Sequence, residues 1–458
     1  MSFSSIDPSS GRLLESFPEL DSRGLDAALR RARRGAERWG ETPLAERSRA
    51  LHRLAEVLRA EAPRLAQIAA REMGKPVRQG RAEVEKCASA CAHYAENAAA
   101  MLAPEPIETD AARSYVRFDP LGVLLAIMPW NFPFWQVFRC AAPALAAGNV
   151  VLLKHAPNVP RCALEIERTV SQAGFVEGAL QALLVSTQVT GELIAHPVVQ
   201  AVTFTGSTHA GADVAARAGR ALKKSVLELG GSDPFIVRAD ADLAKAARAA
   251  IQARTQNSGQ SCIAAKRFVV VHDLADAFVE AFRRGLEDLR VGDPQREDTD
   301  VGPLAREDLL LALDAQVRRS IDAGAKLVTG GHRLPGPGYF YAPTLLDEVA
   351  PGMPVADEET FGPVAAVFRV KDDTEAVSVA NTSEYGLGAS VWSRAPDAAE
   401  ALARKIESGS VFVNGMVKSD PRLPFGGIKH SGYGRELSVH GLREFVNLKT
   451  VWVGRDEA

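Results

Sequence analysis

A cysteine in a short glycine-containing loop is the first residue of this chain whose position suggests chemistry. Gly259, Gln260, Ser261 and Cys262 precede an apolar run that begins near Phe268. A loop just before a strand can expose a thiolate, the reactive form of cysteine, to a small molecule. Without other motifs, a packing role is the more common one for such a residue, because a free cysteine often behaves as a small hydrophobic side chain.

A carboxylate and an amide could assist such a nucleophile. Glu228 ends an apolar segment before Gly230 and Gly231, where desolvation would raise its carboxyl pKa toward the range of a general base. Asn131 lies between Pro129 and Pro133, and this restraint could present its side-chain N–H to a developing oxyanion at little entropic cost. The alternatives are a structural ion pair at Glu228 and a plain proline turn at Asn131.

Two further segments suit a nucleotide. The sequence 204–208, followed by Gly211, has the pattern of a strand, a glycine turn and a helix start, which leaves backbone N–H groups for a pyrophosphate. An ordinary capped helix would show the same pattern. Lys154 closes the apolar run 150–153, at the edge where open α/β sheets bind ligands.

The remaining cysteines and histidines predict no metal site. Cys87 and Cys91 lie four residues apart without neighbouring ligands, and Cys140 and Cys162 lie in alanine-rich surroundings. None of the nine histidines shows the spacing of a zinc site. Five cysteines do not resemble a disulfide framework, and reduced thiols fit a cytoplasmic location.

The composition limits the kinds of molecule that this chain is expected to bind. The 458 residues contain 54 lysines and arginines against 57 aspartates and glutamates, a formal net charge of −3. Without a block of like charges, the chain has no electrostatic signature of a nucleic-acid partner. No apolar stretch reaches the roughly eighteen residues of a membrane-spanning helix, and the start of the chain lacks a signal-peptide pattern. A small-molecule substrate is therefore expected.

The elements that must position these residues follow from hydrophobic periodicity. Residues 21–101 have the apolar spacing of amphipathic helices behind a possible cap at Asp21. After Pro120, short apolar runs alternate with helical stretches, and a second such region extends from Phe268 to about Val413. This alternation predicts an α/β fold with parallel sheets covered by helices. The tail is expected to form a helix and then an exposed strand, Lys449–Val453, that pairs with a neighbouring subunit.

Several segments occur together in an order that resembles the aldehyde dehydrogenase superfamily. They are Pro-Trp-Asn-Phe-Pro at 129–133, Lys154, Phe-Thr-Gly-Ser at 204–207, Leu-Glu-Leu-Gly-Gly at 227–231, Gly-Gln-Ser-Cys at 259–262, Glu-Glu-Thr-Phe-Gly-Pro at 358–363 and Pro-Phe-Gly-Gly at 424–427. The resemblance implies a cofactor-binding α/β domain (1–101 and 121–229), a catalytic α/β domain (230–432) and a small strand-based oligomerisation element (102–120 and 433–458). A homodimer or homotetramer is expected.

The resemblance also implies roles for individual residues. Cys262 would be the nucleophile, Glu228 the general base, and Asn131 with the Cys262 backbone N–H the oxyanion hole. The residues expected to contact a nicotinamide dinucleotide are Trp130, Lys154, Pro157, Gly206, Ser207, Glu359 and Phe361. Pro157 neither repels nor attracts the 2′-phosphate that distinguishes NADP from NAD, so the sequence gives only a slight preference for NAD.

Within the superfamily the chain looks most like the short succinate-semialdehyde dehydrogenases, through the segments 130–139 and 154–160. This implies that Arg139, Trp135 and Ser419 bind the substrate, with an arginine fork holding its carboxylate. A structural ion pair is the alternative role for Arg139. Gln256 stands where longer enzymes of this type carry a second arginine, so a broad-specificity short-chain aldehyde dehydrogenase is the alternative function. Ala264 excludes a redox disulfide with Cys262.

Overall fold

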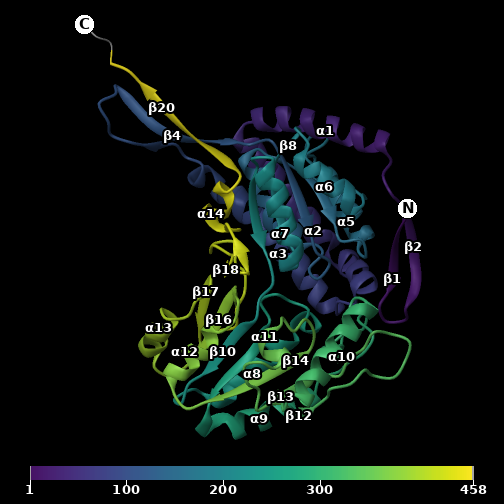
Figure 1. The fold of residues 1–458 in the computed structure, drawn as a ribbon. Helices are drawn as coiled ribbons and strands as arrows, with labels where there is room; N and C mark the ends of the chain where they lie inside the picture. The colour runs from purple at the N-terminus through teal and green to yellow at the C-terminus, as the bar shows by residue number, and fades with distance from the viewer. Residues whose placement is uncertain (1, 456–458) are drawn as a thin grey trace.

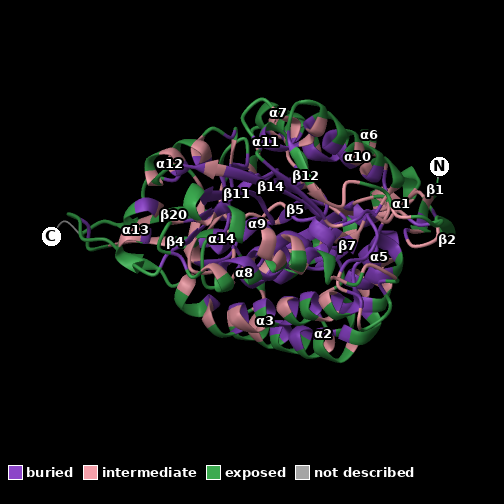
Figure 2. Cartoon of the chain, turned by 90° about the horizontal axis from the view of Figure 1, so that it is seen from below, coloured by how far each residue is buried: buried purple, intermediate pink, exposed green. Residues whose placement is uncertain are grey.

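The computed structural model describes residues 2–455 and contains two large sheets and a projecting arm (Figure 1). This arrangement confirms the α/β class that the sequence predicts. Buried residues fill the two sheets and the helix faces packed on them, whereas the arm is largely exposed (Figure 2).

The first sheet has six strands in the order β19-β9-β8-β5-β6-β7. Their bounds are Val123–Met128 (β5), Val150–His155 (β6), Leu180–Ala182 (β7), Val199–Thr205 (β8), Lys224–Glu228 (β9) and Gly432–Tyr433 (β19). The first five are mutually parallel, and β19 pairs antiparallel with β9. The strand order reverses between β5 and β8, which is where open sheets of this kind form a ligand crevice at the carboxyl ends of their strands.

Helices cover this sheet. They are Ser22–Glu41 (α1), Leu44–Met73 (α2), Val77–Met101 (α3), Trp135–Ala147 (α4), Pro160–Gln172 (α5), Thr187–Ala195 (α6), Thr208–Arg220 (α7) and Ser438–Arg443 (α14). Asp21 caps α1 as expected, because its carboxylate accepts from the backbone N–H of Gly24 at 2.7 Å. The long helices α2 and α3 pack against each other and bring α3 beside α4.

The second sheet has seven strands in the order β12-β13-β14-β11-β10-β16-β17. The strands are Asp233–Val237 (β10), Ala265–Val271 (β11), Lys326–Thr329 (β12), Thr344–Asp347 (β13), Val364–Val370 (β14), Gly388–Trp392 (β16) and Ser410–Val413 (β17). Its helices are Leu243–Thr255 (α8), the 3₁₀ turn Gln256–Gly259 (η1), His272–Glu287 (α9), Glu307–Asp322 (α10), Pro354–Asp357 (α11), Asp373–Asn381 (α12) and Pro396–Ala403 (α13). Only β12 runs antiparallel to its neighbour.

The two sheets meet end to end rather than face to face. The chain leaves β9 at Glu228 and enters β10 at Asp233, so the carboxyl end of the first sheet lies next to the amino end of the second (Figure 1). Segments that follow β5, β6 and β8 therefore face the loop that precedes β11. All the nucleophile, amide and nucleotide segments singled out in the sequence lie along this junction.

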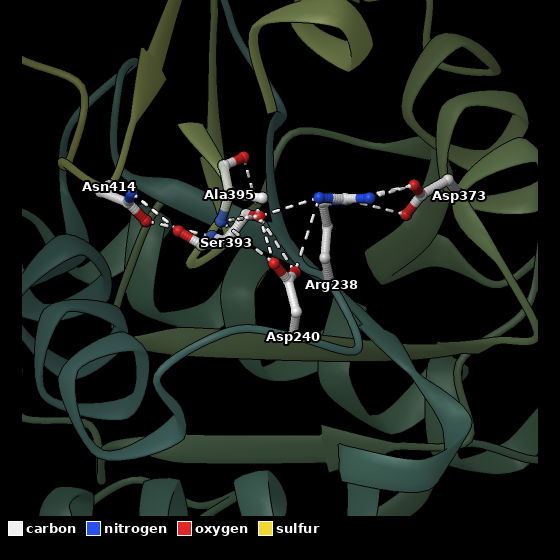
Figure 3. Close-up of polar contacts among 6 residues, drawn as sticks. All are labelled: Arg238, Asp240, Asp373, Ser393, Ala395 and Asn414. Atoms are coloured by element: carbon white, nitrogen blue, oxygen red, sulfur yellow. Dashed lines mark hydrogen bonds and ion pairs between the residues drawn. The ribbon is translucent and has the colours of Figure 1, made fainter. Parts of the chain in front are cut away.

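The carboxyl end of the second sheet is closed by a polar network (Figure 3). Arg238, just after β10, donates to both carboxylate oxygens of Asp373 and to the hydroxyl of Ser393, which in turn donates to Asp240 at 2.8 Å. The backbone N–H of Ser393 donates to Asn414, just after β17. These groups therefore satisfy one another at this end of the sheet.

The projecting arm is a three-stranded sheet of Val446–Val453 (β20), Arg113–Pro120 (β4) and Glu105–Pro106 (β3). The terminal strand begins three residues before the predicted Lys449, because pairing with β4 extends it beyond the apolar stretch. A hairpin of Ser2–Asp7 (β1) with Arg12–Pro18 (β2) and a short antiparallel pair of Tyr385–Gly386 (β15) with Ile428–Lys429 (β18) complete the fold. No helix within residues 2–455 is long and apolar enough to cross a membrane.

The apolar run 150–153 and the predicted terminal strand form β6 and β20, and both strands extend by two or three residues beyond the predicted range. β6, for example, continues through Lys154 and His155, because backbone pairing with β5 does not require apolar side chains. The exact domain limits derived from the resemblance stay predictions.

Candidate active site

The loop that carries Cys262 is held in an uncommon backbone conformation. Asn257 and Ser258 both have φ of 56° and Gly259 has φ of 74°. A Cβ atom on Gly259 would lie 2.2 Å from the carbonyl oxygen of Gly362, so this position requires glycine. Left-handed conformations at two residues that are not glycine cost free energy and indicate a loop fixed by its surroundings.

Two buried cations fix this loop by binding its carbonyl groups. The ammonium of Lys266 donates to the carbonyl oxygens of Ser261 at 3.0 Å and Cys262 at 2.7 Å. The guanidinium of Arg254 donates to the carbonyl of Gly259 at 2.6 Å. Sequence analysis missed both residues, since a single lysine in a strand and an arginine at a helix end carry no local signal of such a role.

The thiol of Cys262 is partly shielded from solvent. Burial raises its pKa to about 12, although the positive charges of Arg139 and Lys266 act in the opposite direction. The thiol is therefore protonated at neutral pH in this structure. A nucleophilic role requires that its proton be removed when a substrate and a cofactor alter the surroundings.

Asn131 lies next to this loop, as the sequence predicts. Its side-chain amide donates to the carbonyl of Gln260 at 3.0 Å, and its own backbone carbonyl accepts from the Asn257 side chain at 2.7 Å. An amide nitrogen carries two hydrogens, so one remains to stabilise an oxyanion beside Cys262.

A buried ion pair positions the turn that carries Asn131. Glu83 pairs with Lys75 and accepts from the backbone N–H groups of Phe134 at 2.8 Å and Trp135 at 2.9 Å. On the other side, the ring of His155 contacts the carbonyl of Pro133 at 2.8 Å. Glu83 thus satisfies the free N–H groups at the start of α4, a role that its place on a distant helix hid from sequence analysis.

Glu228 is buried behind the cysteine loop. Neither of its carboxylate oxygens has a hydrogen-bond partner among residues 2–455, and a Cβ atom on Gly426 would lie 2.7 Å from one of them. Burial raises the pKa of Glu228 well above its usual value, and the nearby charge of Arg139 only partly offsets this. A carboxyl group with a raised pKa and no fixed partner suits proton transfer at neutral pH.

The guanidinium of Arg139 lies in this same interior. It forms an ion pair with Glu436, and both side chains are 2% exposed. It also donates to the hydroxyl of Thr205 at 3.3 Å and lies over the ring of Phe425, 4.6 Å from its centroid. The geometry is that of the structural ion pair weighed in the sequence analysis, so contact between Arg139 and a substrate stays a prediction.

Cys262 opens onto a cleft of about 170 Å³. Its lining includes the expected cofactor residues Trp130, Gly206, Ser207, Glu359 and Phe361, together with Asn131. The rings of Trp130 and Phe361 meet edge to face, 5.7 Å apart. Glu359 accepts from the backbone N–H of Gly231 at 3.1 Å, and Ser207 caps α7, whose first-turn N–H groups have no partners within the helix.

A second cleft, of about 600 Å³, contains Lys154 and Pro157. No hydrogen bond or ion pair within the described part of the chain engages the ammonium of Lys154, and burial lowers its pKa. Arg306 lines the same cleft. An unpartnered, half-buried cation next to the carboxyl end of β6 fits an anionic or hydroxyl-rich ligand.

A third cleft, of about 540 Å³, lies on the other side of the Asn131 turn. It is lined by α3, α8 and η1, and by Phe132, Trp135 and Gln256. The indole N–H of Trp135 donates to the hydroxyl of Ser419 at 3.0 Å. The structure thus brings Trp135 and Ser419 together, whereas Arg139, one turn after Trp135 on α4, does not line this cleft.

Comparison of the whole chain with known protein families agrees with this arrangement of the site residues. The model of the aldehyde dehydrogenase family matches residues 1–451. The chain belongs to the aldehyde dehydrogenase family. Among its relatives is a probable succinate-semialdehyde dehydrogenase [NADP(+)] of Synechocystis, which is 50% identical over 99% of this chain and 100% of its own length. A succinate-semialdehyde dehydrogenase [NADP(+)] of Mycobacterium tuberculosis is 48% identical over 99% of this chain and 100% of its own.

Solved structures agree with this aldehyde dehydrogenase fold. The succinic semialdehyde dehydrogenase of Streptococcus pyogenes, crystallised with NADP+, superposes with a TM-score of 0.97 at 38% identity, covering 99% of this chain and 100% of that one. In this aldehyde dehydrogenase the residues present fit a dinucleotide. Lys154 supplies an unpartnered cation, Glu359 a carboxylate and the start of α7 free N–H groups along the junction of the two sheets.

Proposed function

We propose that this aldehyde dehydrogenase oxidises succinate semialdehyde, or a similar short aldehyde with a distal carboxylate, to the dicarboxylic acid with NADP as the electron acceptor. The observation that carries the proposal is the meeting of Cys262 and Asn131 at a cleft lined by the residues expected to hold a dinucleotide. The full-length similarity to relatives named for this substrate supports the choice of aldehyde.

The chemistry follows from the groups at the junction. Once deprotonated, the Cys262 sulfur adds to the aldehyde carbon, and the resulting alkoxide is stabilised by the free Asn131 amide hydrogen and the Cys262 backbone N–H. A dinucleotide held beside Cys262 would supply the hydride acceptor for this carbon, and Cys262 would then hold the acyl group as a thioester. Glu228 then takes a proton from the attacking water, and the carboxylic acid leaves as the thiol is restored.

The slight preference for NAD expected from Pro157 finds no support, since the relatives at 48–50% identity are named for NADP(+). The cleft at Lys154 is also compatible with a 2′-phosphate. Arg306 adds a second cation there, and the acidic Asp308 is already paired with it at 2.7 Å. NAD is retained as the weaker cofactor.

This proposal predicts a clear result in a spectrophotometric assay. With purified protein, succinate semialdehyde and NADP should give faster formation of reduced cofactor than either propionaldehyde with NADP or succinate semialdehyde with NAD. The reason is that only this pair combines a carboxylated aldehyde with the 2′-phosphate of NADP, and each of these anions can form charge-assisted hydrogen bonds with the protein. Equal kcat/KM for the two aldehydes would instead support the broad-specificity alternative. Equal values for the two cofactors would remove the preference for NADP.

We also propose that the arm joins copies of this chain. β20 is an edge strand, paired on one side only by β4, and it exposes Leu448 (62%), Trp452 (55%) and Val453 (40%). An unpaired edge with exposed apolar side chains favours association.

Cytoplasmic location stays a prediction; the five cysteines are all unpaired in the structure.

Trp452→Asp should therefore reduce the molar mass measured by light scattering after size-exclusion chromatography. The new charge would lie in the proposed interface, where desolvation makes it costly. Leu222→Asp is the matched control, because Leu222 is 95% exposed but lies outside the arm. A wild-type protein that is already monomeric would refute the proposal.

A further inference from the structure

A buried glutamine on the wall of the Cys262 cleft has a side-chain carbonyl without a partner. Gln136 is the second residue of α4, is 2% exposed and lines this cleft together with Thr205. Its backbone N–H donates to the carbonyl of Phe132 at 3.0 Å, but its side-chain oxygen accepts no hydrogen bond within residues 2–455. An amide carbonyl buried in this way costs folding free energy, which indicates a role other than packing.

The side chain of Gln136 enters the same interior as that of Glu228. Arg139, one turn further along α4, lies on the same face of the helix and donates to the hydroxyl of Thr205 at 3.3 Å. Thr205 is the partner of Glu228 in the pairing of β8 with β9, and paired residues of neighbouring strands project from the same face of a sheet. Gln136 and Glu228 therefore approach the space beside the cysteine from a helix and from a strand.

Both residues offer hydrogen-bond acceptors to this space. The two carboxylate oxygens of Glu228 have no donor among residues 2–455, and neither has the side-chain oxygen of Gln136. An amide carbonyl and an ionised carboxylate can only accept. Two acceptors that share a polar interior are both satisfied by a molecule that donates two hydrogens, and water is the smallest such molecule.

We propose that the side-chain carbonyl of Gln136 holds the water molecule that hydrolyses the Cys262 thioester. This inference rests on the proposed function. Gln136 accepts one hydrogen of the water and Glu228 accepts the other, so that an oxygen lone pair is directed at the acyl carbon. A general base alone fixes only one of the two hydrogens, whereas a second acceptor also fixes the rotation of the water.

The hydrolytic step conserves atoms and charge. The water oxygen bonds to the acyl carbon while Glu228 takes one hydrogen as a proton, and the second hydrogen stays on the new carboxylic acid. The carbon–sulfur bond then breaks with its electron pair on sulfur, and the proton returns from Glu228 to restore the thiol of Cys262. Gln136 exchanges no proton, so its contribution is the orientation of the attacking water.

Gln136→Met tests this role, because it removes the carbonyl with little change in size. The burst of reduced cofactor should keep its rate, since hydride transfer precedes the attack of water. Decay of the thioester should slow by about 10- to 100-fold, the effect of losing a hydrogen bond that orients a reactant. Stopped-flow absorbance measures the burst, and mass spectrometry of the acid-quenched protein measures the acylated fraction over time. Gln136→Leu, a second apolar variant, should behave in the same way.

Thermal melting distinguishes this role from a structural one. Gln136→Met should melt at or above the temperature of the wild type, because it removes a buried carbonyl that has no partner. Gln181→Met is the matched control, since Gln181 is also buried but accepts from Arg31 at 2.9 Å and donates to the carbonyl of Ala28 at 3.1 Å. This control should melt lower than the wild type and keep the wild-type rates of burst and thioester decay.

The two proposals fail in different ways. Wild-type protein that forms no acylated cysteine with succinate semialdehyde and NADP would refute the proposed function. If the wild type forms the thioester and it decays equally fast in Gln136→Met and Gln136→Leu, Gln136 does not hold the water. A variant in which burst and decay slow together, or in which only the KM for NADP rises, would show that Gln136 positions the aldehyde or the dinucleotide instead.

Discussion

Cys262→Ala should lower turnover of succinate semialdehyde by about 10⁴-fold or more, since removal of a nucleophile leaves only the contribution of binding and oxyanion stabilisation. The burst of reduced NADP in the first turnover should also disappear, because hydride leaves only from a carbon already bonded to sulfur. Stopped-flow absorbance of the reduced cofactor measures both quantities. Binding of NADP, followed by fluorescence, should be retained.

Cys91→Ala provides the matched control. Cys91 is fully buried in α3, and burial raises its pKa to about 12, so its thiol is a packing group. Its removal should leave the burst intact and cost roughly 1 kcal/mol of stability, as for the loss of a small buried group. A burst that survives in Cys262→Ala would remove the cysteine from the mechanism.

The sequence predicted the parts of the site that follow strands. Asn131, Lys154 and Gly206 each come at or just after the carboxyl end of an apolar run, and the topology of the first sheet places those ends together. The reason is physical: a parallel sheet collects the residues after its strands at one edge, whatever their separation in the chain.

The sequence did not predict the groups that reach the site from elsewhere. Lys266 and Arg254 bind the carbonyls of the cysteine loop, and Glu83 binds the start of α4, although all three look like ordinary charged residues of helices and strands. Their roles depend on tertiary packing, which periodicity does not reveal.

The partner of Arg139 shows the limit of a motif. Its position within the segment 130–139 predicts a substrate ligand, which stays a prediction, but the motif gives no sign of its ion pair with the buried Glu436, some 300 residues later in the chain. Since a buried guanidinium is stable only with a partner, the presence of that carboxylate decides where the charge goes.

Glu228→Gln should separate the two halves of the reaction. The burst of reduced NADP should persist, because forming the thioester does not require the water-activating base. Steady-state turnover should fall by about 10²- to 10⁴-fold, the usual contribution of a general base. In the wild type, the decay of the thioester should accelerate as pH rises through the raised pKa of Glu228, since only the carboxylate accepts a proton. The glutamine variant should lack this pH dependence.

Thermal melting of Glu228→Gln distinguishes a loss of base catalysis from a loss of folding stability. The folded-state pKa of Glu228 lies above its unfolded value, so the folded protein loses stability as pH rises through the folded pKa and the buried group ionises. Glutamine carries no charge at any pH. The melting temperature of Glu228→Gln relative to the wild type should therefore increase between pH 5 and pH 9. A variant that melts progressively lower than the wild type at high pH would indicate that the Glu228 carboxylate stabilises the fold, and a normal turnover at pH 8 would show that another group activates the water.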